Sequence, residues 1–246
     1  MQLLRRTILI TGGATGIGYA LAAQLWRCNT VIVCGRRETS LAAAALALPG
    51  LVTRRCDLCN SAERRALVAW LRAEYPALDV LINNAGIQKF VDFTQSSDED
   101  SIIQEVSTNF VVPALLANEL IPHLIGQDDA LIVNISSGLG FCPLADAPIY
   151  SATKAALHSL SLSLRWQLRH AAIRVVELIP PIVATDLAGP SGHARRSSTE
   201  DPPVITSEAF AAEALRRLEA GETEIPVGIA EGLRLRREDM FALIND

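Results

Sequence analysis

A glycine-rich turn near the start of the chain constrains the fold more than any other segment. Thr7 to Thr11 is a short apolar run typical of a buried strand, and it leads into Gly12 to Gly18. Tyr19 to Arg27 then has the pattern of a helix. A strand, a glycine turn and a helix in that order form an anion site. Backbone N–H groups at the helix start point at the ligand, and the absent side chains admit a pyrophosphate. The order predicts a dinucleotide site.

The rest of the chain alternates apolar strands with helical segments. Strands are expected at 30–34, 51–55, 79–83, 130–135, 173–179 and 224–227, and helices at 40–48, 61–75, 98–125, 148–170 and 207–220. Such repeats of nearly continuous apolar strands predict a mainly parallel seven-stranded sheet with helices on both faces, a Rossmann-type three-layer α/β/α sandwich. The 246 residues fit one domain, 1–246, with a polar substrate loop at about 187–203 and a charged tail after 227.

The composition excludes several classes of function. The formal net charge of −5 argues against a nucleic-acid partner, which usually needs a basic excess. No apolar run reaches membrane-spanning length and no signal-peptide pattern is present, so we expect a soluble cytoplasmic protein without a membrane partner. Five cysteines, an odd number in a chain of this size, suit reduced thiols. Cys56 and Cys59 form a CxxC pair with no second pair, so no metal site is expected.

The end of the second expected strand indicates which dinucleotide binds. Gly35, Arg36 and Arg37 follow that strand, and in a βαβ nucleotide fold this tip meets the adenosine ribose. An acidic residue there binds the 2′-hydroxyl of NAD, whereas an arginine accommodates the 2′-phosphate of NADP. The two arginines therefore favour NADP. NAD stays open, because a solvated arginine pair or a one-residue change in alignment would reverse the preference.

The helix expected at 148–170 carries an acid–base pair. Tyr150 and Lys154 are four residues apart, so their side chains lie on one face of that helix. A free phenol titrates near about pH 10, and a neighbouring cation favours the phenolate and lowers its pKa towards the range of general acid–base catalysis. His158, one turn further along, is expected to be packed or interfacial rather than catalytic.

Two further polar groups are candidates for the same site. Ser137 follows the strand expected at 130–135, where a hydroxyl can hydrogen-bond a substrate oxygen. Asn109 lies in the helix expected at 98–125, four residues before Pro113. Because proline has no N–H, the main-chain carbonyl of Asn109 is left without its helical donor and can hold a water molecule.

Together these pieces resemble the short-chain dehydrogenase/reductase family in its single-domain form. The matching motifs, in family order, are TGGATGIG at 11–18, Asp57, NNAG at 83–86, Asn109, Ser137, Tyr150 with Lys154, and the proline segment that ends at Thr185. They span roughly the whole chain. More narrowly, NNAGIQ, VNISSGLGFCPLADAPIYSATKAALHSLSLSLR and ELIPPIVATDL are similar to the DltE-like oxidoreductases.

The resemblance implies an NADP(H)-dependent oxidoreductase that interconverts a carbonyl and a secondary alcohol by hydride transfer. Tyr150 would be the acid/base and Ser137 would polarise the carbonyl. Lys154 would lower the tyrosine pKa and bind the nicotinamide ribose, and Asn109 would hold a water that links Lys154 to solvent. The implied cofactor contacts are Gly12, Thr15, Gly16, Ile17, Gly18, Arg36, Arg37, Asp57, Leu58, Asn83, Ala85, Gly86, Tyr150, Lys154, Ile182, Val183 and Thr185. The family also implies a homodimer or homotetramer packed through the helices of Asn109 and Tyr150.

Two departures from the family pattern bear on these expectations. Pro181 stands where many members have glycine, which stiffens the backbone beside the nicotinamide. Thr15 stands where many NADP-preferring members have a basic residue, so Arg36 and Arg37 would have to select the phosphate alone. An NAD-preferring dehydrogenase and a cofactor-sensing regulator with little turnover are the alternatives. A regulator would be expected to lose the Tyr, Lys and Ser set, which this chain keeps.

Overall fold

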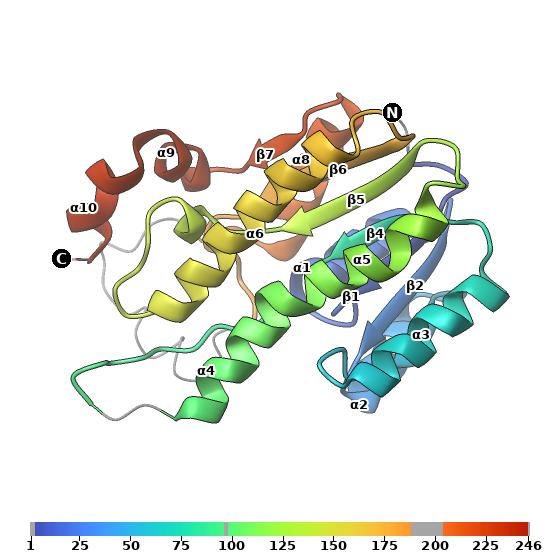
Figure 1. The fold of residues 1–246 in the computed structure, drawn as a ribbon, viewed down its shortest axis with the longest axis horizontal. Helices are drawn as coiled ribbons and strands as arrows, with labels where there is room; N and C mark the ends of the chain where they lie inside the picture. Colours follow the sequence, from blue (N-terminus) through green and yellow to red (C-terminus); the bar gives the residue numbers. More distant parts are fainter. Residues whose placement is uncertain (1–2, 96–97, 188–203, 246) are drawn as a thin grey trace.

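The computed structural model describes residues 3–95, 98–187 and 204–245 (Figure 1). At its centre lies one seven-stranded sheet with the order β3-β2-β1-β4-β5-β6-β7, and every strand pair in it is parallel. The strands are β1 (Thr7–Thr11), β2 (Thr30–Gly35), β3 (Val52–Arg55), β4 (Leu78–Asn83), β5 (Ala130–Ile135), β6 (Ile173–Ile179) and β7 (Glu224–Pro226). The predicted Rossmann-type fold is confirmed.

Helices cover both faces of the sheet. The first face carries α1 (Gly16–Leu25), α2 (Glu38–Ala47) and α8 (Ser207–Glu219). The second carries α3 (Ser61–Glu74), α5 (Val112–Leu124) and α6 (Pro148–Gln167), and α4 (Glu99–Val106) leads into α5 through η1 (Ser107–Val111). No helix in the described part of the chain combines the length and apolar character needed to span a bilayer.

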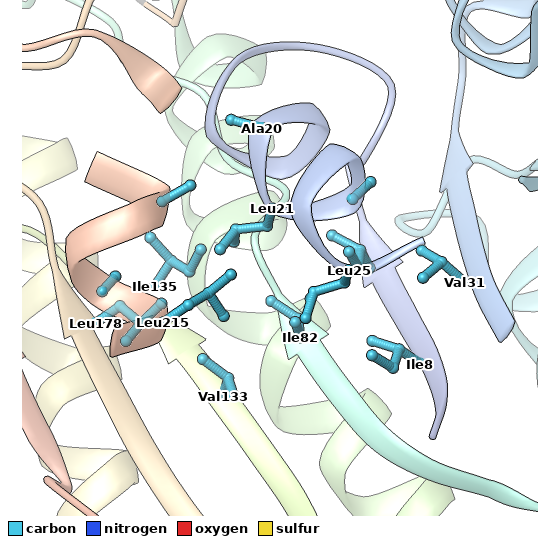
Figure 2. Packing of buried hydrophobic residues seen from close by; sticks show 14 of the residues in the cluster. Ile8, Ala20, Leu21, Leu25, Val31, Ile82, Val133, Ile135, Leu178 and Leu215 are labelled. Atoms are coloured by element: carbon cyan, nitrogen blue, oxygen red, sulfur yellow. The ribbon is translucent and has the colours of Figure 1, made fainter. Parts of the chain in front are cut away.

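The strands are apolar at consecutive positions because both of their faces are buried. Ile8 and Ile10 of β1 pack into the core beneath α1 and α8, whereas Leu9 between them packs into the core on the other face. Figure 2 shows the first of these cores, in which Leu21 of α1 and Leu215 of α8 meet the strand residues. A side chain alternates between faces along a strand, so a strand inside three layers needs no polar positions.

The strand order reverses between β1 and β4. After β1 the chain builds β2 and β3 on one side, and then returns to the other side for β4 to β7. In open α/β sheets, ligands bind outside the carboxyl ends of the strands at such a reversal. The sheet therefore places the glycine turn after β1 and the Asn83–Gly86 loop after β4 next to each other.

The helix expected at 98–125 contains a wider turn than predicted. A π-helical turn, η1, separates α4 from α5, where we expected a proline kink in an α-helix. Pro113 lies in the first turn of α5 and has no N–H to offer the carbonyl four residues back. Single π-turns inside α-helices are frequent at functional sites, and this one carries Asn109.

The segment after residue 227, expected to be a charged tail, is helical. It forms α9 (Ile229–Arg236), η3 (Arg237–Met240) and α10 (Phe241–Asn245). Three apolar residues stand between the charged residues of this segment and are buried: Ala230, Leu233 and Met240. The expected substrate loop at 187–203 lies outside the described residues except for Leu187.

Candidate functional site

The glycine turn after β1 is closely packed on itself and on the loop after β4. Gly12 and Gly16 have φ of +62° and +55°, a conformation that L side chains rarely adopt. A Cβ added to Gly12 would lie 3.0 Å from the Cα of Ala85, and one added to Gly18 would lie 2.7 Å from the carbonyl oxygen of Gly12. Glycine is therefore required at these positions, and the bare backbone is the kind of surface that a pyrophosphate can approach.

Two side chains lock the two loops together. Thr11 Oγ1 accepts hydrogen bonds from the N–H groups of Asn84 and Ala85, each at 3.0 Å. Asn84 Nδ2 donates to the carbonyl oxygens of Thr11 and Gly12 at 2.8 and 3.1 Å. Thr11 and Asn84 were not among the predicted site residues, although both lie inside the motifs that predicted the site. Their role depends on the adjacency of β1 and β4.

The segment after β6 reaches the same turn. A Cβ on Gly16 would lie 3.1 Å from Cγ2 of Thr185, so these two predicted cofactor contacts are neighbours. Residues 182–184 are held in place by Ile205, whose N–H donates to Ile182 and whose carbonyl accepts from Ala184. Thr185 therefore borders the glycine turn, whereas Ile182 and Val183 are seen only beside Ile205.

The predicted residues at the adenine end are arranged around β2 and β3. Arg36 and Arg37 are both exposed, and Arg37 Nη2 donates to Thr15 Oγ1 at 3.3 Å across the mouth of the glycine turn. Asp57 Oδ1 accepts from the N–H of Cys59 at 3.0 Å, and Leu58 is buried. The guanidinium of Arg37 thus stands beside the residue that precedes Gly16.

Asn83, another predicted cofactor contact, has its side chain inside the sheet. It is buried, and its Nδ2 donates to Oδ1 of Asn134 on the neighbouring strand at 2.9 Å. Ala85 and Gly86, further along the same loop, are only partly buried. Ala85 and Gly86 are therefore accessible to a ligand, whereas the side chain of Asn83 is used inside the sheet, in its hydrogen bond to Asn134.

Tyr150 and Lys154 lie on the first turns of α6, and both are buried. Lys154 Nζ donates to the carbonyl of Ile135 at 2.8 Å and lies 5.5 Å from the centre of the Tyr150 ring. Burial lowers the pKa of Lys154 from 10.5 to about 8, against the charges of Glu177 and Glu105, which raise it. The charge of the Lys154 ammonium therefore depends on the carboxylates of Glu177 and Glu105, which oppose the effect of burial.

Ser137 begins the turn η2 (Gly138–Gly140) beyond β5. Its Oγ accepts from the N–H of Leu139 at 3.1 Å, which fixes the side-chain rotamer. The turn packs directly on α6, because a Cβ added to Gly140 would lie 2.9 Å from the carbonyl carbon of Lys154. The serine turn and the Tyr150–Lys154 helix therefore hold each other in place.

Asn109 is fully buried in the π-turn and ties three segments together. Its side chain exchanges two hydrogen bonds with the main chain of Ile87, at 2.8 and 2.9 Å, and donates to Oγ1 of Thr153 on α6 at 3.1 Å. A Cβ added to Gly86 would lie 3.3 Å from Asn109 Oδ1 and 3.7 Å from Lys154 Nζ. The catalytic candidates thus meet the cofactor loop at Gly86.

The last helix holds the loop that follows the serine turn. Asn245 Nδ2 donates to the carbonyl of Pro143 at 3.1 Å, and its Oδ1 accepts from the N–H of Ala145. In the same loop Cys142 is buried against Leu233 and Met240. Sequence reasoning missed this support, because it treated the segment after 227 as a tail.

Comparison with known proteins identifies the family. The model of the short chain dehydrogenase family matches residues 6–196. The chain belongs to the short-chain dehydrogenase family. It is 44% identical over 236 residues to an uncharacterised oxidoreductase, DltE, of Bacillus subtilis (strain 168), covering 95% of this chain and 92% of that one. It is 30% identical over 178 residues to the NADP-dependent 3-hydroxy acid dehydrogenase YdfG of Salmonella typhi, covering 72% of each.

A solved structure of a short-chain dehydrogenase supports the same conclusion. The enzyme from Sphingobium yanoikuyae, in complex with NADPH, has a TM-score of 0.80 and 28% identity, covering 89% of this chain and 87% of its own. This short-chain dehydrogenase is thus an NAD(P)-dependent oxidoreductase. The positive-φ glycines of the turn after β1, Gly12 and Gly16, fit the close approach of a dinucleotide's pyrophosphate. Among the described residues, no three His, Cys, Asp or Glu side chains gather as a metal ion would require.

Gly18→Ala tests whether the close packing of the turn is what permits cofactor binding. The added Cβ would lie 2.4 Å from Asn84 Nδ2 and 2.7 Å from the carbonyl oxygen of Gly12, so the turn must move. We expect NADPH affinity, measured by fluorescence titration, to fall about tenfold or more, which corresponds to about 1.4 kcal/mol. Gly232→Ala in α9, where a Cβ meets nothing within 4 Å, should keep the parental affinity. Parental affinity in Gly18→Ala would contradict this account.

Proposed function

We propose that this short-chain dehydrogenase interconverts a carbonyl and a secondary alcohol, with NADP(H) as its cofactor and Tyr150 as the acid/base. The observation that carries the proposal is the junction at Gly86, where an added Cβ would lie within 4 Å of both Asn109 Oδ1 and Lys154 Nζ. Tyr150 is one turn before Lys154 on the same helix. The nicotinamide, when bound, supplies or accepts the hydride.

Tyr150 and Ser137 act on the oxygen atom of the substrate. In reduction the Tyr150 hydroxyl gives its proton to the carbonyl oxygen as hydride arrives at the carbon, and in oxidation the phenolate takes the proton back. Ser137 Oγ already accepts a hydrogen bond from Leu139, so its own O–H is free to donate to the substrate oxygen. The ammonium of Lys154 favours the phenolate that remains after proton transfer.

Asn109 fixes the proposed route by which protons from a water molecule reach Lys154. Its side-chain oxygen and nitrogen are both used in hydrogen bonds to Ile87 and Thr153, which fix the π-turn. Pro113 offers no N–H to the main-chain carbonyl of Asn109, so this carbonyl is the group that would hold a water next to Lys154. Lys154 would then donate a proton to the Tyr150 phenolate and take up a proton from that water.

The preference for NADP rests on Arg37 and Arg36. The hydrogen bond from Arg37 to Thr15 brings a guanidinium to the place where many related enzymes have a basic residue. Glu38, the first acidic residue after the strand tip, lies 3.7 Å from the guanidinium of Arg55 and is drawn towards β3. The YdfG relative is named as NADP-dependent, and the Sphingobium yanoikuyae enzyme was solved with NADPH.

We also propose that the protein is a cytoplasmic homodimer or homotetramer that pairs through the helices of Asn109 and Tyr150. All five cysteines are free thiols, as a reducing compartment requires. Leu162 and Trp166 are four residues apart on α6 and are 43% and 69% exposed, and Ile103 on α4 is 53% exposed. In the proposed assembly, a second copy would cover these exposed apolar side chains.

Tyr150→Phe tests the role of the phenol. The substitution removes the transferable proton, so turnover should fall by at least about a thousandfold, while the Kd for NADPH stays within about twofold of the parent. NADPH oxidation with a panel of ketones and aldehydes is the measurement, and Tyr75→Phe at the end of α3 is the matched control. Full activity in Tyr150→Phe would refute the assignment. A parental enzyme that consumes no NADPH with any substrate of the panel would favour the cofactor-sensing regulator.

Replacing Arg36 with Asp and Arg37 with Ala tests the cofactor preference. The acid can bind a ribose 2′-hydroxyl and repels a 2′-phosphate, so the ratio of kcat/KM for NADPH to that for NADH should fall about tenfold to a hundredfold. Arg169→Ala, just after the end of α6, is the charge control and should leave the ratio unchanged. An unchanged ratio in the double variant would mean that another group recognises the phosphate.

Trp166→Glu tests the proposed assembly. A carboxylate in the centre of an apolar interface would be buried without a partner, so the variant should dissociate into smaller species. Size-exclusion chromatography with light scattering measures the mass, and Leu46→Glu on α2, at a position 86% exposed, is the control. A parental protein that is monomeric at micromolar concentration would refute the assembly.

A further inference from the structure

A row of polar side chains crosses the sheet beneath α6. In the strand register Asn83 pairs with Asn134, Asn134 with Glu177, and Glu177 with Glu224. Asn83 Nδ2 donates to Asn134, and Asn134 Nδ2 donates to Oγ of Ser161 on α6, both at 2.9 Å. Residues paired in register point to the same face, so the row faces α6. It runs from the cofactor loop to the edge of the sheet.

Glu177 is the fully buried acidic member of this row. Its Oε2 lies 2.7 Å from Nδ1 of His158 on α6, and the side chain has no exposed area. In the residues that the structure describes, its Oε1 is buried with no hydrogen-bond partner. A buried carboxylate is strongly unfavourable unless a cation offsets its charge and its oxygens are hydrogen-bonded.

Lys154 is the buried cation closest in the chain to this pair. It lies one helical turn before His158 on the same side of α6, and its Nζ bonds to the carbonyl of Ile135, which follows Asn134 in β5. Both charges are desolvated, so each lowers the free-energy cost of burying the other. The charge of Glu177 raises the pKa of Lys154, and Glu105 of α4 acts in the same direction to a smaller extent.

We propose that Glu177 is a positioning residue whose carboxylate keeps Lys154 cationic, and that the hydrogen bond from His158 holds this carboxylate in place. The proposal rests on the function proposed above for Lys154. Without the charge of Glu177, burial favours the neutral amine. Without the His158 donor, both oxygens of Glu177 would be buried unpaired, so the carboxylate would lose its fixed position and with it its effect on Lys154.

The other charged groups around this pair have their own partners or lie further out. Glu224, next in the row, is bound by Arg165 at 3.1 Å and by Arg234 Nε at 3.0 Å. Arg234 and Arg237 line a surface cavity of about 340 Å³ beside His158, so its 19% exposed ring has access to solvent. Tyr150 is the titratable group on the site side of Lys154, and Lys89 is the cation beside Glu105.

The sequence makes the charge of Lys154 directly measurable. Lys89 and Lys154 are its only lysines. Protein grown with ε-¹³C-lysine would therefore give two side-chain NMR resonances, and Lys154→Arg assigns them. A pH titration of the cofactor-free parent should show Lys154 titrating near pH 8. In Glu177→Gln and in His158→Phe the Lys154 midpoint should move to lower pH by about one pH unit, whereas the Lys89 midpoint should not move.

Ser161→Ala is the matched control, because it removes a buried polar group of the same row without changing charge. It should leave the Lys154 midpoint at the parental value. Glu177→Gln combined with His158→Phe should move the midpoint no further than Glu177→Gln alone, since His158 acts through Glu177. An unmoved midpoint in Glu177→Gln would overturn the proposal, and a shift in Glu177→Gln without one in His158→Phe would overturn the role of His158. If Glu177→Gln does not fold, His158→Phe alone decides, because it changes a partly exposed ring.

Turnover gives a second readout that a merely structural role would not produce. In Glu177→Gln the alkaline limb of the kcat profile should move to lower pH, so that kcat falls up to about tenfold at pH 8.5 and stays within about twofold of the parent at pH 6. A uniform loss of kcat at every pH would contradict the proposal. The NMR titration needs no turnover, so an inactive parent would refute the proposed function without deciding the charge of Lys154.

Discussion

Four hydrogen bonds between the end of β1 and the loop after β4 hold the site together. Thr11 and Asn84 exchange two of them, and the other two join Thr11 to Ala85 and Asn84 to Gly12 across the point where the strand order reverses. A Cβ added to Gly86, in the same loop, would lie within 4 Å of Asn109 Oδ1 and Lys154 Nζ. The glycine turn and the proposed catalytic residues therefore share one rigid reference, and neither loop can shift without disturbing the other.

Polar groups at this site are buried, and the structure provides nearly every partner from within. Asn109 uses Ile87 and Thr153, and Asn134 uses Asn83 and Ser161. Where water is largely excluded, these hydrogen bonds are stronger and their dipoles stay oriented before the substrate arrives. Among the described residues, the buried atoms without a partner include Asn83 Oδ1, Glu105 Oε2, Ser136 Oγ and Glu177 Oε1. For Glu177, the proposed charge compensation by Lys154 would take the place of the missing hydrogen bond.

Much of the site could be predicted because its signals are local. The glycine turn lies between one strand and one helix, and the spacing of Tyr150 and Lys154 is set by a single helix. The contact of His158 with Glu177 depends on which residue of β6 faces α6, so helical spacing alone made His158 look merely packed. The π-turn at Asn109 arises from Pro113 together with hydrogen bonds to the distant Ile87. The helices after 227 were missed because arginines and glutamates obscure a short apolar pattern.

The anchoring of the Pro143–Ala145 loop by Asn245 has a consequence for biosynthesis. The hydrogen bonds that join the glycine turn to the loop after β4 come from residues 11, 12, 84 and 85, which leave the ribosome early. The loop beyond Ser137 acquires its last two hydrogen bonds only when residue 245 has been translated. A nascent chain would thus be able to form these bonds well before the Pro143–Ala145 loop is anchored. The shape of the loop that follows Ser137 depends on a residue 100 positions beyond Ala145 in the chain.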